Sequence, residues 1–161
     1  MTPETIVLEL ARIEAAHLAG LVVQFDELLD ESADSGDDPA VLRLVPDAYE
    51  DPEAAREFRE VTESDLLGRR RSDAARVLAT LGHVGELGDD LDDPAFVEQV
   101  SIVLDREDVQ AWLRTLAAIR LVLATRLGIV NDDEHDHDDP KYGIYDWLGY
   151  RLDGLVGALD A

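Results

Sequence analysis

The densest set of potential metal ligands in this chain lies in one acidic stretch. Residues 131–139 read NDDEHDHDD and place His135 and His137 among six carboxylates. Carboxylates and imidazoles together can bind a divalent cation. However, the two histidines are only two residues apart in a loop-like segment, and the stretch lacks the glycine and the spaced oxygen ligands of an EF-hand loop. We therefore expect a solvated loop without a metal, with His135 and His137 as the candidate ligands if one binds.

Two arginines fall on helix faces that are otherwise apolar. Arg120 lies in the apolar sector of one predicted helix, and Arg70 lies in the apolar stripe of another. A buried guanidinium needs carboxylate or carbonyl partners, and Glu14 and Asp146 are the candidate acids. One interpretation is an internal ion-pair network that fixes how the helices pack, which we favour. The other is an anion or ligand pocket lined by Arg70 and Arg120.

The last predicted helix carries aromatic side chains on two sides. Its predicted core stripe consists of Ile144, Tyr145, Leu148, Leu152, Leu155 and Leu159. Trp147 and Tyr150 project from another side, near Gly154 and Gly157. Tryptophan and tyrosine are common anchors of protein interfaces. A partner surface and packing beneath the preceding loop both remain open.

Composition excludes several other kinds of chemistry. The sequence holds no G-x-S-x-G, H-E-x-x-H or phosphate-binding loop, so we predict neither catalytic residues nor a cofactor. The absence of cysteine removes disulfides, zinc–thiolate sites and thiol redox chemistry. A net charge of −23 repels phosphate backbones and suits a basic partner, which disfavours direct nucleic-acid binding. Arginines 69–71 lie among acids, and we expect them to pair within the chain.

Length and hydropathy predict one globular domain that spans residues 1–161. Apolar residues make up 46% of the chain, enough for a sizeable core. No apolar run approaches the ~18 residues of a membrane span. The opening MTPETIVLEL has no basic segment before its apolar residues, unlike a secretory signal. We expect a cytoplasmic protein.

The elements that position these residues are predicted to pack around one helix, residues 105–128. That segment is apolar on nearly every side, which is typical of a buried helix. Asp105 is the predicted N-cap, Asp108 completes a capping box, and Gly128 is the predicted C-cap.

The remaining elements make the predicted fold mainly α, with four or five helices and two or three short strands. Strands are predicted at 5–10, 41–45 and 99–104, other helices at about 11–30, 51–61, 62–84 and 144–159, and acidic loops at 30–40, 86–93 and 131–139. The boundary between the predicted helices 51–61 and 62–84 rests on a capping box at Thr62–Asp65. A short similarity between TIVLEL and SIVLD, each followed by a helix, predicts two strand–helix units with adjacent strands.

Two segments carry a resemblance to a known family. AWLRTLAAIRLVLATRLGI (111–129) and IYDWLGYRLDGLV (144–156) resemble the actinobacterial family of the oxidative-stress transcriptional regulator AosR, long catalogued as a domain of unknown function. EFREVTESDLLGRRR (57–71) and the opening strand with its helix extend the resemblance over most of the chain. It implies a cytoplasmic protein of transcription control and stress response that contacts a sigma factor or RNA polymerase. Thiol-based oxidant sensing is excluded in this chain, which has no cysteine.

Together these observations predict a non-enzymatic regulatory protein that acts through protein–protein contacts. Its expected partner surface includes Trp147 and Tyr150. Two alternatives remain: an anion- or metal-dependent enzyme of unknown reaction, and a structural homodimer.

Overall fold

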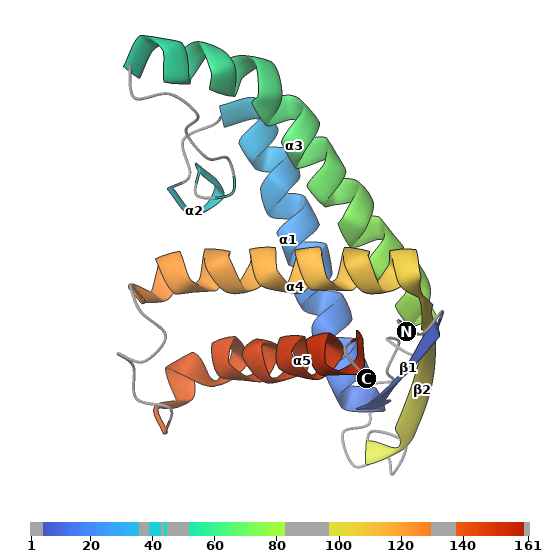
Figure 1. Cartoon of the computed structure of the whole chain (residues 1–161). Helices are drawn as coiled ribbons and strands as arrows, with labels where there is room; N and C mark the ends of the chain where they lie inside the picture. The colour runs from blue at the N-terminus through green and yellow to red at the C-terminus, as the bar shows by residue number, and fades with distance from the viewer. Residues whose placement is uncertain are drawn as a thin grey trace.

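The computed structural model describes residues 5–35, 39–42, 44, 52–82, 97–129 and 138–159. This part of the chain is mainly helical with one small sheet, as predicted (Figure 1). Its elements are β1 (Thr5–Ala11), α1 (Arg12–Ser35), α2 (Pro39–Leu42), α3 (Pro52–Leu81), β2 (Gln99–Asp105), α4 (Arg106–Leu127), the 3-10 helix η4 (Pro140–Tyr142) and α5 (Gly143–Leu159).

Helix α4 begins and ends where its capping residues predict. The Asp105 side chain accepts a hydrogen bond of 2.8 Å from the backbone N–H of Asp108, and the Asp108 side chain accepts one of 3.1 Å from Asp105 N–H. Gly128 closes the helix in the left-handed conformation, with φ of 73°. Both caps satisfy backbone groups that a helix end leaves without partners.

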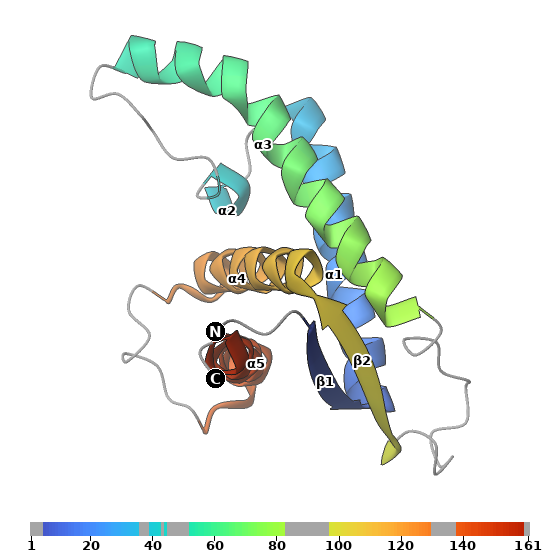
Figure 2. The same ribbon diagram turned by 45° about the vertical axis from the view of Figure 1, so that its right-hand side comes forward.

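Helix α4 is the centre of the packing. It lies between α3 and α5, and it also contacts α1, α2 and the sheet (Figures 1 and 2). Its buried residues point in several directions: Val109, Ala111, Trp112, Thr115, Leu116, Ala118, Ile119, Val122 and Ala124. The prediction of a central helix that is buried on most sides is therefore confirmed.

The sheet consists of β1 and β2 in antiparallel register, with Val7 opposite Val103. Its inner face buries Ile6 and Leu104, whereas the outer face leaves both valines exposed. Each strand runs directly into a helix, β1 into α1 and β2 into α4. The predicted adjacency of two strand–helix units is confirmed. Because the strands are antiparallel, α1 and α4 begin at opposite ends of the sheet (Figure 2).

Helices α1 and α3 run side by side and are joined across their outer surfaces (Figure 1). The Arg71 guanidinium lies 2.9 Å from Asp26 Oδ1 and 3.1 Å from Asp30 Oδ1. The predicted pairing of the 69–71 cluster within the chain is thus confirmed for Arg71. Beneath these ion pairs, α1 buries Leu18, Val22, Phe25 and Leu29.

Three predicted boundaries are wrong. Residues 39–42 of the expected strand and loop form α2, because Pro39 suits the first position of a helix and the next residues tolerate helical dihedrals. The acidic stretch after residue 30 continues α1 to Ser35. The capping box at residues 62–65 lies inside α3, since no proline or glycine ends the helix ahead of it. The loop predicted at 86–93 lies outside the described residues, as do residues 131–137 of the loop predicted at 131–139.

None of the helices in the described ranges combines the length and the apolar character needed to cross a membrane.

Candidate functional site in the groove between α1 and α5

An open groove of about 810 Å³ lies between the first half of α1 and the first half of α5. Most of its wall is apolar. Helix α1 contributes Glu14, Ala16, His17, Gly20, Leu21 and Gln24, and helix α5 contributes Gly143, Ile144, Trp147, Tyr150 and Arg151. Pockets with apolar walls and a few polar groups are typical binding sites, and this volume lies within their usual range of roughly 300–1,000 Å³.

Trp147 lines the groove from α5. Its side chain is half-buried and packs against the main core, while its indole Nε1–H donates a 3.0 Å hydrogen bond to Glu14 Oε2. This bond joins α5 to α1 across 133 residues of sequence. Trp147 therefore packs against the core and also lines the groove, and a partner surface at this residue stays a prediction.

Glu14 and Arg151 form the polar wall of the groove. The Arg151 guanidinium pairs with Glu14 Oε2, and the backbone N–H of Ala11 lies 3.4 Å from Glu14 Oε1. Burial alone raises the pKa of the Glu14 carboxyl, but the hydrogen bonds from Arg151 and Trp147 favour the charged form and bring the net pKa below its ordinary value. The carboxylate is therefore held ionised and neutralised by one cation.

Tyr150 and Ile144 are the exposed apolar side chains of this site. Tyr150 is 69% exposed and Ile144 is 50% exposed. Ile144 was predicted to be a core residue, which is wrong, because its side of α5 faces the groove and no described element covers it. Its neighbour Tyr145 is buried instead, in a small cluster with Ala124 and Ile129.

Two glycines leave space in the groove, and two more lie beyond it along α5. A Cβ atom placed on Gly20 would meet no heavy atom within 4 Å, and the same is true of Gly143. Gly154 and Gly157 follow Tyr150 at helical spacing, and both are exposed with free space around them. All four predicted interface residues lie on α5. Trp147 and Tyr150 line the groove, and Gly154 and Gly157 lie further along the helix.

Arg120 packs against α5 rather than lining a pocket with Arg70. Its Nε–H donates a 3.2 Å hydrogen bond to the backbone carbonyl of Tyr145, and its guanidinium carbon lies 3.9 Å from the centre of the Tyr145 ring. The absence of a side chain at Gly149 makes room for it, because a Cβ there would lie 2.9 Å from Arg120 Nη2. Asp146, one of the proposed acids, is half-buried in the same first turn of α5.

Arg70 lies on the other side of α4. It points toward the backbone carbonyl of Arg114 at 3.4 Å and borders a shallow hollow with Leu44, Leu113, Ala117, Ala118 and Leu121. The structure does not bring Arg70 and Arg120 into one pocket. It also assigns Glu14 to Arg151, a pairing that the sequence did not indicate because the two residues are 137 positions apart.

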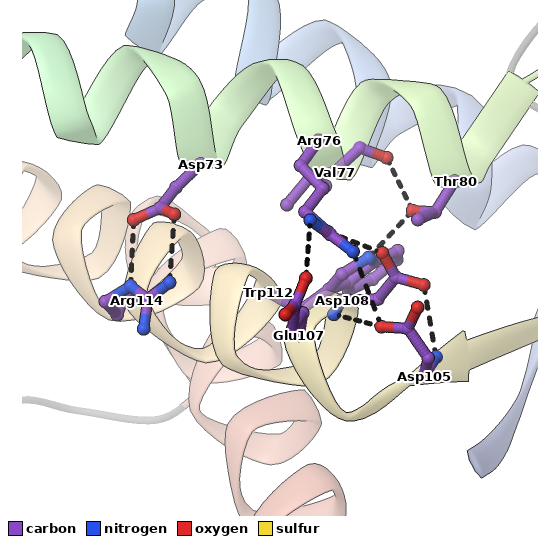
Figure 3. A network of polar contacts seen from close by, with 9 residues as sticks. All are labelled: Asp73, Arg76, Val77, Thr80, Asp105, Glu107, Asp108, Trp112 and Arg114. Atoms are coloured by element: carbon purple, nitrogen blue, oxygen red, sulfur yellow. Dashed lines mark hydrogen bonds and ion pairs between the residues drawn. The ribbon is translucent and has the colours of Figure 1, made fainter. Parts of the chain in front are cut away.

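A polar network between α3 and α4 was also missed by sequence reasoning (Figure 3). Arg114 Nε–H donates to Asp73 Oδ2 at 2.8 Å, and Arg76 Nε–H donates to Asp108 Oδ1 at 2.7 Å. The buried Trp112 indole donates to Thr80 Oγ1 at 2.8 Å. No motif connects these residues along the sequence, so only the packing of two helices reveals the network.

The network in Figure 3 joins α3 to α4 through paired charges and one buried hydrogen bond. Burial raises the pKa of Asp108, but the hydrogen bonds from Arg76 and the Asp105 backbone outweigh this effect and lower the net pKa. Each charged group thus faces an opposite charge at hydrogen-bonding distance. Residues 138–159 and the other described ranges contain no cluster of three potential metal ligands, and His135 and His137 lie outside those ranges.

Comparison with known proteins places this chain in a family. The family described as "Domain of unknown function (DUF2017)" matches residues 1–159, so the chain belongs to it. No curated protein and no solved structure matches the chain.

Proposed function

We propose that this DUF2017 protein is a non-enzymatic regulator, linked to transcription control, that acts through protein–protein contacts at the groove between α1 and α5. The observation that carries the proposal is the groove itself, an open apolar surface that includes Tyr150, Ile144 and Trp147. Tyrosine and tryptophan contribute much of the binding energy in protein interfaces. Exposed apolar surface of this kind marks a binding region on a folded domain.

The polar groups of the groove support binding rather than catalysis. Of its described lining residues, Glu14, His17 and Arg151 can carry charge near neutral pH, and Glu14 and Arg151 neutralise each other. An acid–base pair needs two groups that can exchange protons with a substrate, and outside the Glu14–Arg151 pair His17 is the one such group of the three. The alternative of an anion-dependent enzyme loses its main support, since Arg70 and Arg120 lie on different sides of α4.

The link to transcription control rests on the resemblance to the family of the regulator AosR. That resemblance implies a sigma factor or RNA polymerase as the partner, and a cytoplasmic location. The net charge of −23 favours a partner with a basic surface, because opposite potentials accelerate encounter and select the partner. Any regulation by this chain proceeds without a cysteine redox switch.

Affinity capture from an extract of the native cells tests this proposal with a matched pair of variants. Gly20→Phe places a large side chain in the groove, whereas Gly68→Phe makes the same change at an exposed α3 glycine that has open space around it and lies outside the groove lining. We expect wild type and Gly68→Phe to retain a sigma factor or polymerase, and Gly20→Phe to lose it. Recovery of the bait alone, or equal retention by Gly20→Phe, would contradict the proposal.

A further inference from the structure

The exposed side of α1 extends the groove beyond its apolar part. His17, Gly20, Gln24, Glu27 and Glu31 recur at intervals of three or four residues and are all exposed. Residues at this spacing share one face of a helix. The α1 wall of the groove therefore continues into a stripe that ends in carboxylates.

The described lining of the groove is charge-balanced, and the α1 stripe that leads out of it carries carboxylates. Arg151 is the one arginine or lysine among the lining residues that the structure describes, and Glu14 neutralises it. Glu27 adds a carboxylate on the stripe that leads out of the groove, and the whole chain carries a net charge of −23. A partner segment with lysine or arginine beside its apolar residues complements this surface.

The shape of the groove fits a helix. Two helices form its walls, Leu21 and Trp147 belong to its apolar lining, and the missing side chains of Gly20 and Gly143 leave room for a backbone to approach. Helix-in-groove recognition uses large apolar residues at one face of the incoming helix, at intervals of three and four. A volume of about 810 Å³ accommodates several such side chains.

Other occupants fit less well. A second copy of this chain would bring another charge of −23 to the same surface, and like charges oppose association. A small ligand is usually enclosed over ~70–90% of its surface, whereas this groove is open along one side.

We infer that the groove binds a cationic amphipathic helix of the partner. The apolar side chains of that helix enter between Gly20 and Trp147 and contact Tyr150, and its lysine or arginine residues face Glu27. This inference rests on the proposed function, and it adds the chemical class of the segment that is recognised.

A synthetic peptide provides a direct probe. It is built of leucine and lysine, with leucine at helical spacing on one face, and is about 18 residues long because shorter helices are marginal in water. A scrambled peptide of the same composition disperses the leucines, and an acidic peptide replaces each lysine by glutamate. Fluorescence anisotropy at physiological ionic strength is expected to show at least tenfold tighter binding of the cationic amphipathic peptide than of either control.

Variants locate that binding on the groove. Gly20→Phe is expected to weaken it at least tenfold. Gly68→Phe, the same change at an exposed α3 glycine with open space around it and outside the groove lining, is expected to leave it unchanged, with thermal unfolding confirming that both variants fold. Tyr150→Ala is expected to weaken it because an exposed aromatic anchor is lost. Glu27→Lys is expected to weaken it several-fold, whereas Asp153→Lys, the same charge change at an exposed α5 position outside the groove lining, is expected to have little effect.

Each result that differs from these expectations contradicts either the helical partner or the proposed function. If the scrambled peptide binds as tightly as the cationic amphipathic peptide, the binding is a general attraction of opposite charges and the inference is overturned. Tighter binding of the acidic peptide than of the cationic amphipathic peptide also overturns the inference. A dimer in light scattering that Gly20→Phe converts to a monomer overturns it in favour of a second copy. If extract capture depends on Gly20 but the peptide does not discriminate, the helical partner is wrong and the proposed function stands. If the peptide binds as expected but no regulator is captured, the proposed function fails.

Discussion

Substitution of Glu14 by glutamine tests the junction that holds α5 against α1. The change preserves the shape of the side chain but removes the charge that pairs with Arg151. Hydrogen bonds to a charged group contribute about 1.5–3 kcal/mol, and the partial exposure of the pair, 20% for Arg151 and 29% for Glu14, reduces this contribution through solvent screening. We expect the free energy of unfolding to fall by roughly 1–2 kcal/mol, which lowers Tm by about 3–6 °C in a chain of this size.

Glu27→Gln is the matched control. It removes the same charge from an exposed position of the same helix, so it reports how the loss of one negative charge affects a chain of net charge −23. Urea unfolding followed by circular dichroism at neutral pH measures both variants. Equal stabilities of Glu14→Gln and Glu27→Gln would refute the argument that Glu14 has a specific partner.

The stability of wild type and of Glu14→Gln at different pH values tests the direction of the Glu14 pKa shift. The pKa of Glu14 in the folded chain lies below the ordinary value of 4.5. The stability that its ionised form contributes is therefore fully present above pH 4.5 and is lost as the pH falls through the lowered pKa. The difference between wild type and Glu14→Gln should narrow in that acidic range, and a difference that stays constant at lower pH would contradict the shift.

Three further substitutions probe the packing of single side chains. Gly149→Ala is expected to lower the free energy of unfolding by about 1–2 kcal/mol relative to Gly157→Ala, because its Cβ would displace Arg120 whereas Gly157 lies in open space. Chemical unfolding measures both variants, and equal effects would contradict the close approach of Arg120 to Gly149. Thr80→Val should lower the free energy of unfolding by about 1–3 kcal/mol, since it leaves the indole N–H of a buried tryptophan without its acceptor. Thr115→Val should leave stability unchanged or raise it by about 1 kcal/mol, because the buried Thr115 hydroxyl has no hydrogen-bond partner among the described residues. A marked loss of stability would show that this hydroxyl is bonded.

Part of the candidate site could be predicted from the sequence. Trp147 and Tyr150 were identified because they lie off the apolar stripe of α5, and Tyr150 is indeed exposed. The α1 wall of the groove was not identified, since His17 and Gly20 have no distinctive pattern along the chain. An exposed glycine beside an apolar stripe was the one available signal, and it has meaning only when another helix faces it.

The arginines show the same limit. Helical periodicity correctly singled out Arg120 as a cation that needs partners, and the structure supplies the carbonyl and the ring of Tyr145. Periodicity could not identify that partner, because it describes one helix and contains no information about which residue of another helix lies opposite. For this reason the sequence assigned Glu14 to Arg70 or Arg120, whereas the fold pairs it with Arg151.

The sequence by itself determined the features that depend on neighbouring residues. The caps of α4, the two strands and the apolar stripes follow from interactions within about one turn or one strand pair, so local residue types specify them. The tertiary structure alone decided the features that join distant segments: the groove between α1 and α5, the Glu14–Arg151 pair and the network of Figure 3. Their geometry depends on how whole helices cross, and that is set by the packing of the complete core around α4.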